Sequence, residues 1–82
     1  MTPTDEELQR FENLPLYLKK IAALLALGLT NKEMAQKMNL HPRTIHIYKH
    51  RLIETVLFDT SLKLAVYIVR HPQIEKMLRE AL

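Results

Sequence analysis

Cysteine is absent from the 82-residue chain, and so are long hydrophobic runs. Without cysteine the protein forms neither disulfides nor thiolate metal sites, so its fold depends on packing alone. The longest uninterrupted apolar run, Ile21 to Leu27, is far shorter than the roughly 20 residues that a membrane-spanning helix needs. The N-terminus is acidic where a signal peptide would be basic. These absences predict a soluble cytoplasmic protein that has no membrane partner.

Glycine occurs once, at Gly28, and no internal repeat, low-complexity tract or long linker divides the chain. Eighty-two residues make one small domain, since a chain of this length buries only roughly 60–65% of its unfolded surface in a single core. Apolar residues recur at helical spacing, and the connections between these patterns are short. The sequence therefore predicts an all-α fold, a compact helical bundle.

Acidic residues are missing from the middle of the chain, between Glu33 and Glu54, although the formal net charge is only +3. This window holds four basic residues and three histidines, namely Lys37, Arg43, Lys49, Arg51, His41, His46 and His50. A cationic face of this kind favours a polyanion, because binding releases the condensed counterions. On charge alone, a solvated helix face remains the alternative.

The stretch from Asn31 to Arg51 reads as two short helices joined by a tight turn, which is a helix-turn-helix. Thr30 or Asn31 can cap the first of these helices. The small Ala35 permits a close crossing of two helices, because a larger side chain would hold the backbones apart. Asn39 lies at the turn and tolerates the left-handed conformation that such a turn often needs when glycine is absent.

The second helix of the motif is expected over about residues 42–53. Ile45, Tyr48 and Leu52 recur at i, i+3 and i+7 and bury one face of it. The opposite face then carries Arg43, His46, Ile47, His50 and Arg51. An exposed isoleucine among cationic and hydrogen-bonding groups fits contact with base edges and a thymine methyl group. This face predicts a recognition helix for double-stranded DNA, with Arg43, His46, Ile47 and His50 as the base-contacting residues.

Two helices are expected before the motif. Thr4 and Glu7 form a capping-box pattern at the start of a short accessory helix over about residues 3–13. The next helix is the core helix, with Pro15 in its first turn and Gly28 as its C-cap. Its broad apolar stripe consists of Leu14, Leu18, Ile21, Leu24, Leu25 and Leu29.

After the motif, the helix expected to end near Arg70 has more apolar surface than one core contact uses. One of its stripes consists of Leu64, Tyr67 and Ile68, and the other of Leu62, Ala65, Val66 and Val69. A subunit interface is the expected use of the surplus, which predicts a homodimer with Leu62, Ala65, Val66 and Val69 at its interface. The final segment, from Pro72 onward, is also amphipathic. Packing in cis and pairing across a dimer both stay open for it.

The segment GLTNKEMAQKMNLHPRTIHIYKHRL, from Gly28 to Leu52, resembles the DNA-binding domain of LuxR-type (GerE-type) bacterial transcription regulators. The family opening Gly-Leu-(Ser/Thr)-Asn-Lys-Glu-Ile-Ala corresponds to 28–35, and the family Arg-Thr-Val-Lys corresponds to 43–46. The Lys-Leu-Gly that usually follows the recognition helix is replaced by residues 55–57. The resemblance covers about residues 14–70.

The resemblance implies a four-helix domain that binds DNA as a dimer, with its third helix in the major groove and its fourth at the dimer interface. Carried over by position, the base-contacting residues are His46, Ile47 and His50. The phosphate-contacting residues are Thr30, Asn31, Lys32, Arg43 and Thr44. Charge and helical phase add Lys49 and Arg51 to the phosphate contacts, and the outer face adds Arg43 to the base contacts.

Together these patterns predict a four-helix LuxR-type core with short N- and C-terminal helices. We expect an accessory helix in 1–13, a DNA-binding core in 14–58 and dimerisation helices in 59–82. The expected function is sequence-specific binding of double-stranded DNA by a small, nucleoid-associated transcriptional regulator that needs no cofactor. No receiver or ligand-sensing segment precedes the motif, so a free-standing DNA-binding unit is expected, with any regulatory protein partner unidentified.

The sequence offers three alternative functions. His46 and His50 at i, i+4, with His41 nearby, have a spacing that permits a metal site, but no neighbouring carboxylate or cysteine completes the ligand set. An enzyme is not expected, because no motif brings the histidines together with Ser61 or Asp59. The main alternative is a small helical protein-interaction module that uses the helix-turn-helix only as a scaffold.

Overall fold

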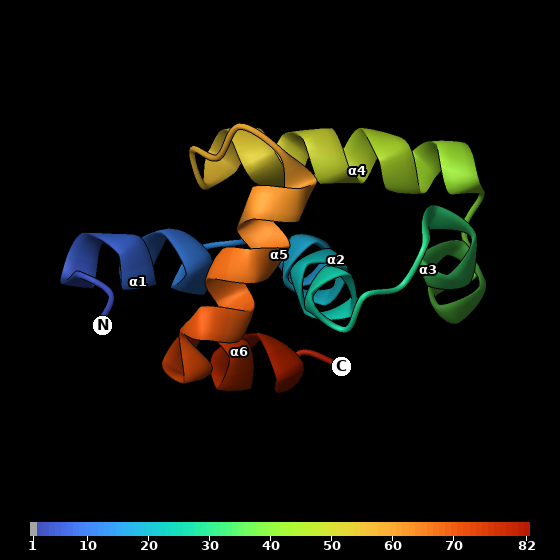
Figure 1. The fold of residues 1–82 in the computed structure, drawn as a ribbon. Helices are drawn as coiled ribbons and strands as arrows, with labels where there is room; N and C mark the ends of the chain where they lie inside the picture. Colours follow the sequence, from blue (N-terminus) through green and yellow to red (C-terminus); the bar gives the residue numbers. More distant parts are fainter. Residues whose placement is uncertain (1) are drawn as a thin grey trace.

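The computed structural model describes residues 2–82, and within them the chain forms six helices (Figure 1). They are α1 (Asp5–Glu12), α2 (Leu16–Ala26), α3 (Asn31–Met38), α4 (Pro42–Thr55), α5 (Ser61–Arg70) and α6 (Pro72–Arg79). The predicted all-α bundle, with short helices flanking a four-helix core, is confirmed. None of the helices in residues 2–82 has the length and apolar character required to cross a membrane.

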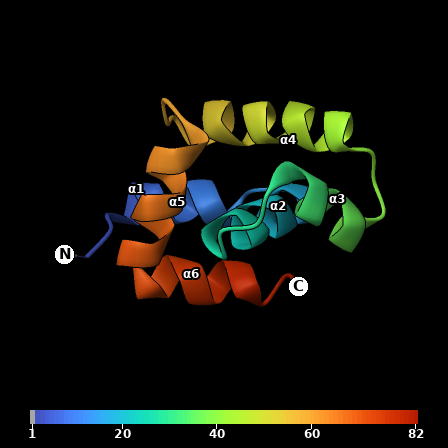
Figure 2. The ribbon, with the colours of Figure 1, turned by 45° about the vertical axis from the view of Figure 1, so that its right-hand side comes forward.

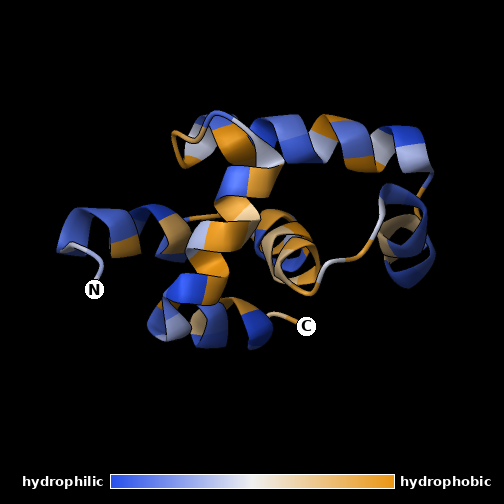
Figure 3. Cartoon of the chain, in the orientation of Figure 1, coloured by the Kyte–Doolittle hydropathy of each residue, from blue (hydrophilic) through white to orange (hydrophobic). Residues whose placement is uncertain are grey.

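The helix α2 is the centre of the bundle, and α3, α4, α5 and α6 all pack against it. In both ribbon views α4 and α6 lie on opposite sides of α2 (Figures 1 and 2). Hydrophobic residues dominate α2, at the centre of the bundle, and much of α5, whereas α1, α4 and α6 alternate hydrophilic and hydrophobic segments (Figure 3). Ile21 and Ala22, in the middle of α2, have no solvent exposure.

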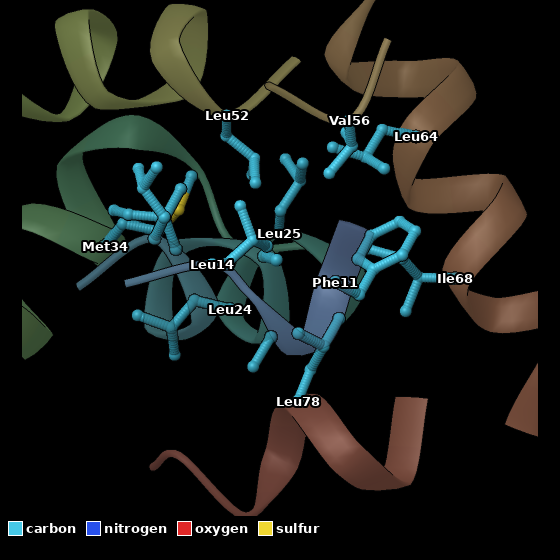
Figure 4. Packing of buried hydrophobic residues seen from close by; sticks show 14 of the residues in the cluster. Phe11, Leu14, Leu24, Leu25, Met34, Leu52, Val56, Leu64, Ile68 and Leu78 are labelled. Carbon is cyan, nitrogen blue, oxygen red and sulfur yellow. The ribbon is translucent and has the colours of Figure 1, made fainter. Parts of the chain in front are cut away.

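The core draws side chains from all six helices (Figure 4). The labelled members include Phe11, Leu14, Leu24, Leu25, Met34, Leu52, Val56, Leu64, Ile68 and Leu78. Of the apolar stripe predicted for α2, only Leu29 is half-buried instead of buried. Pro15 is the N-cap of α2 and not a residue of its first turn.

Side-chain caps determine where the helices begin. The predicted Thr4–Glu7 capping box is present at α1, and Thr30 forms a second one with Glu33 at α3. In each box the threonine hydroxyl accepts a hydrogen bond from the glutamate N–H, and the glutamate carboxylate accepts one from the threonine N–H. Each box therefore satisfies two amides that a helix start leaves without a partner.

The two apolar stripes of α5 have different surroundings. Leu64 and Ile68 are fully buried, whereas Leu62, Val66 and Val69 are exposed and Ala65 is half-buried. The final helix α6, for which the sequence left two arrangements open, packs in cis. Its Ile74 and Leu78 are fully buried, and α6 lies against α2, α5 and α1 of the same chain.

The N-terminal helix α1 is attached to α5 through Tyr67. The Tyr67 hydroxyl donates a hydrogen bond to the Glu7 carboxylate, and the Phe11 ring stacks on the Tyr67 ring at 6.0 Å. On its other sides Tyr67 contacts the rings of Phe58 at 5.0 Å and His71 at 4.1 Å. Phe11 is buried, so α1 contributes to the core as well as being an accessory helix.

Leu57 follows α4 in a left-handed conformation, with φ 63°, and is 69% exposed. It occupies a position where the LuxR-type sequences usually have glycine. The two other described residues with positive φ are Asn39, at 56° in the predicted turn, and Gly28, at 83° after α2. A side chain in this region brings Cβ close to the following carbonyl, which costs roughly 1–2 kcal/mol.

We expect Leu57→Gly to raise the free energy of unfolding by about 0.5–1 kcal/mol, because glycine adopts positive φ without the Cβ penalty and Leu57 contributes little packing. Urea denaturation followed by circular dichroism measures this change. The matched control is Gly28→Ala, where no atom lies within 4 Å of the added Cβ, so that only backbone strain changes. It should lower stability by about 1 kcal/mol. If both substitutions changed the free energy of unfolding in the same direction and by the same amount, backbone strain at Leu57 would be refuted.

Stability should also depend on Glu7 and on pH. The hydrogen bond from Tyr67 and those from Thr4 lower the Glu7 pKa below its ordinary 4.5 in the folded protein. A lowered pKa means that the stabilisation is present above about pH 4.5 and is lost as the pH falls through the folded value. Glu7→Gln should therefore reduce the urea midpoint at neutral pH, and the difference from the wild type should close as the pH falls through the lowered pKa of Glu7. Glu12→Gln, at an exposed residue of the same helix, is the control. A gap that does not change with pH would refute the mechanism.

Candidate nucleic-acid interface

The helix α4, which the sequence predicts to be the recognition helix, begins with a histidine cap. His41 is the N-cap, and its Nδ1 accepts a hydrogen bond from the Arg43 amide at 3.0 Å. Pro42 follows in the first turn, where its missing N–H costs no hydrogen bond. His41 therefore holds the start of the helix, and α4 runs from Pro42 to Thr55, slightly past the predicted end.

Burial of one side of α4 fixes its rotation about its own axis. Ile45 and Leu52 are completely buried, as predicted, and α4 packs against both α2 and α3. Tyr48 is half-buried and contacts the ring of Tyr17 at a centroid distance of 4.7 Å. Because these side chains hold the inner face, the residues at the other helical positions must face outward.

The predicted base-contacting residues lie together on that outer face. Arg43, His46, Ile47 and His50 are all exposed, and Ile47 is 46% exposed despite its apolar side chain. The His46 and His50 rings meet edge to face at 4.6 Å, one helical turn apart. The structure thus presents two imidazoles, a guanidinium and an aliphatic side chain on one continuous surface.

Glu54 is exposed on the same helix, four residues after His50 and seven after Ile47. This spacing places it at the C-terminal end of the same outer face. The sequence prediction used Glu54 only as the end of the acid-free window and did not include it in the site. Its spacing of seven residues from Ile47, which is two helical turns, could have placed Glu54 on this face from the sequence alone.

The predicted phosphate-contacting residues fall into two groups. Thr30, Asn31 and Lys32 lie at the start of α3, and Thr44, Lys49 and Arg51 lie along α4. Thr30, Lys32 and Arg51 are exposed, whereas Asn31, Thr44 and Lys49 are half-buried. The hydroxyl of Thr30 already accepts a hydrogen bond from the Glu33 amide within the capping box.

Lys49 joins the two helices of the motif. Its Nζ donates a hydrogen bond to Oδ1 of Asn31 at 2.8 Å, a contact between residues 18 positions apart. Partial burial lowers the pKa of the Lys49 ammonium. The contact fixes the start of α3 relative to the middle of α4, so two residues predicted from charge and resemblance also hold the motif together.

Arg51 lies beside two aromatic rings. Its Nη1 is 3.5 Å from the Tyr17 hydroxyl, and its guanidinium carbon lies 5.7 Å from the centre of the Tyr48 ring. These contacts orient the arginine at the edge of the outer face. Sequence reasoning did not include Tyr17, because it lies outside the apolar stripe of α2 and 34 residues away from Arg51.

A metal site on the histidines of α4 is one of the alternatives that the sequence leaves open. His46 and His50 are close, but residues 2–82 contain no group of three or more histidine, aspartate and glutamate side chains arranged to hold a metal ion. The His41 ring nitrogen Nδ1 is engaged with the Arg43 amide.

The surface of α5 that faces away from the core is apolar. Leu62 is 73% exposed, and Val66 and Val69 lie beside it at helical spacing. A shallow hollow lies on each side of Val66. One is bordered by Leu25, Ala26, Gly28, Ala65, Val69 and Arg70, and the other by Phe58, Leu62, Lys63, Tyr67, Arg70 and His71.

Comparison with known proteins gives one match. Residues 19–56 match the family described as bacterial regulatory proteins, luxR family. No match was found among curated proteins or among solved structures. The matched segment begins in α2 and ends just after α4, so it contains both helices of the motif and most of α2, the helix on which they pack. The chain therefore carries, over residues 19–56, a LuxR-type helix-turn-helix, the DNA-binding unit of a family of bacterial transcription regulators.

Proposed function

We propose that this protein binds specific double-stranded DNA sequences as a homodimer and regulates transcription, with α4 in the major groove. The observation that carries the proposal is the outer face of α4. Its Arg43, His46, Ile47 and His50 are exposed together, on the second helix of a LuxR-type motif. This face combines an aliphatic side chain with hydrogen-bonding and cationic groups, which match a thymine methyl group and the polar base edges of the major groove.

The dimensions of this face suit base reading. His50 follows Arg43 by seven positions, which is roughly 10 Å along a helix and about three base pairs of DNA. Arg43 suits the O6 and N7 acceptors of guanine, and Ile47 suits a thymine methyl group. His46 and His50 supply ring nitrogens that donate to, or accept from, base edges.

Phosphate contacts would orient the motif. The start of α3 offers the exposed Lys32 and the main-chain amides of Asn31 and Lys32, at the positive end of the helix dipole. In α4, Thr44 and Arg51 are seven positions apart and lie on one flank of the base-reading residues, and Lys49 lies on the other. Lys49 would contribute both its charge and the hydrogen bond that holds Asn31 in place.

The outer face of α5 would form the dimer interface through Leu62, Ala65, Val66 and Val69. Three of these residues are exposed, and hollows on both sides of Val66 can receive the ridge of a second copy. A two-fold interface pairs the same patch on both subunits. The proposed division of the chain is an accessory helix, a DNA-binding core and dimerisation helices. Because α6 packs on its own chain, the interface between subunits would lie on α5. The dimer would present two copies of α4 to successive major grooves, about 34 Å apart.

Salt dependence separates DNA reading from the alternative of a protein-interaction module. Binding to mixed-sequence duplex DNA should weaken steeply between about 50 and about 200 mM salt, because each neutralised phosphate releases counterions. Selection from a random duplex pool should then give an inverted repeat. Absence of duplex binding at low salt would favour the interaction module.

For the selected site, His50→Ala and His46→Ala should each weaken specific binding by about 1–3 kcal/mol without lowering stability, because both side chains are exposed. Fluorescence anisotropy on the selected and on a scrambled duplex measures both affinities. Gln73→Ala, at an exposed residue of α6, serves as the control. Wild-type affinity in both histidine variants would remove them from the reading face.

Val66→Glu should convert the dimer into a folded monomer, because it places a charge at the centre of the apolar α5 face. Analytical ultracentrifugation measures the association, and circular dichroism checks the fold. Leu16→Glu introduces the same charge at an equally apolar exposed residue outside α5 and should leave the dimer intact. A wild-type protein that is monomeric at high concentration would exclude this interface.

A further inference from the structure

A hollow of about 570 Å³ lies between the second half of α2, the connection to α3 and the end of α3. Its lining residues are Lys20, Leu24, Leu27, Leu29, Lys37, Met38 and Leu82. Leu27 is 59% exposed although its side chain is apolar. The lining is therefore an apolar floor with two lysines, and the apolar groups on it are only partly covered by the chain itself.

The two lysines have no acidic partner within residues 2–82. Ion pairs there join Arg10 to Glu6, Lys63 to Asp59 and Arg79 to Glu75, and none involves Lys20 or Lys37. Glu33 lies one helical turn before Lys37 on α3 and borders a neighbouring hollow with it, but its carboxylate accepts a hydrogen bond from the Thr30 amide and forms no ion pair with Lys37. Two positive charges beside apolar surface complement a ligand that is both acidic and apolar.

This hollow is distinct from both surfaces that the proposed function uses. Lys20, Leu24 and Leu27 lie on one side of α2, whereas Leu25 and Ala26 border the hollow beside the α5 face. None of the predicted base-contacting or phosphate-contacting residues lines it. A ligand in the hollow therefore competes neither with the α4 outer face nor with the α5 face for the same side chains.

We propose that this hollow docks an acidic amphipathic helix of a partner protein. Apolar side chains one turn apart on the partner would fill the space over Leu24, Leu27 and Met38, and carboxylates beside them would pair with Lys20 and Lys37. Flexible methionine and leucine side chains accommodate such a helix in a groove. In this arrangement an amphipathic helix lays its apolar side in an apolar groove. Lys20 and Lys37 would favour acidic helices and repel basic ones.

A second copy of this chain is a poorer occupant. The acidic amphipathic helix that the chain itself offers is α1, with Asp5, Glu6 and Glu7 in its first turn. Its apolar Phe11 is already buried in cis, and Glu7 bonds to Tyr67. Docking α1 into a neighbour would break these contacts, so a different protein is the favoured source of the helix.

The test uses a fluorescein-labelled helical peptide of 14 residues, with leucines at i, i+3 and i+7 and glutamates on both sides of them, titrated with the full chain. Leu27→Glu and Lys37→Glu should each weaken binding at least tenfold. Leu16→Glu is the matched control, because Leu16 is 58% exposed on the same helix but does not line the hollow. It should bind like the wild type. A peptide with lysines in place of the glutamates should not bind.

Several results would overturn the proposal. They are equal affinity of the Leu27→Glu and Leu16→Glu variants, binding of the lysine peptide, or no binding at millimolar peptide. Competition by anionic phosphatidylglycerol vesicles, or loss of self-association in Leu27→Glu, would assign the surface to a membrane or a second copy instead. DNA affinity is measured in parallel and should be unchanged in Leu27→Glu, so failure of peptide binding is distinct from failure of the proposed function.

Discussion

Burial of α2 on several sides is the constraint on which the other helices depend. Its central residues Ile21 and Ala22 have no solvent exposure, and α3, α4, α5 and α6 each bury an apolar stripe against it. A domain of this size has one small core, so each flanking helix has a single way to hide its stripe. That choice determines which side of each helix is left outside. The outer face of α4 is therefore a consequence of how Ile45 and Leu52 pack.

The two helices of the motif are held to one another by contacts of different kinds. Ala35 is nearly fully buried and lets α3 approach its neighbours closely. Asn39 turns the chain in the left-handed conformation, and Lys49 bonds to Asn31 across the motif. A recognition helix that is fixed in this way does not have to be ordered when it binds, which reduces the entropic cost of association.

Local signals predicted much of the fold. The capping box at Thr4, the turn at Asn39 and the rotation of α4 all follow from residues within one or two turns of each other. Contacts between residues far apart in the sequence could not be predicted, because residue spacing does not show which helix surfaces meet. The bonds from Tyr67 to Glu7 and from Lys49 to Asn31 are of this kind. The DNA contacts of the candidate site stay predictions, since exposure shows only that a side chain can be reached.

The outer surfaces differ in chemistry because core packing restricts only the inner side of each helix. Stability restricts the inner stripe of each helix, whereas the outer side chains have few neighbours and are free to differ. The α4 face carries arginine, imidazole and aliphatic side chains with Glu54 at its end, the α5 face is largely apolar, and the hollow beside α2 combines apolar side chains with Lys20 and Lys37. Because these surfaces share no lining or contact residues, a substitution on one should have little effect on the others. An 82-residue domain can thereby offer separate surfaces to DNA, to a second copy and to a partner without enlarging its core.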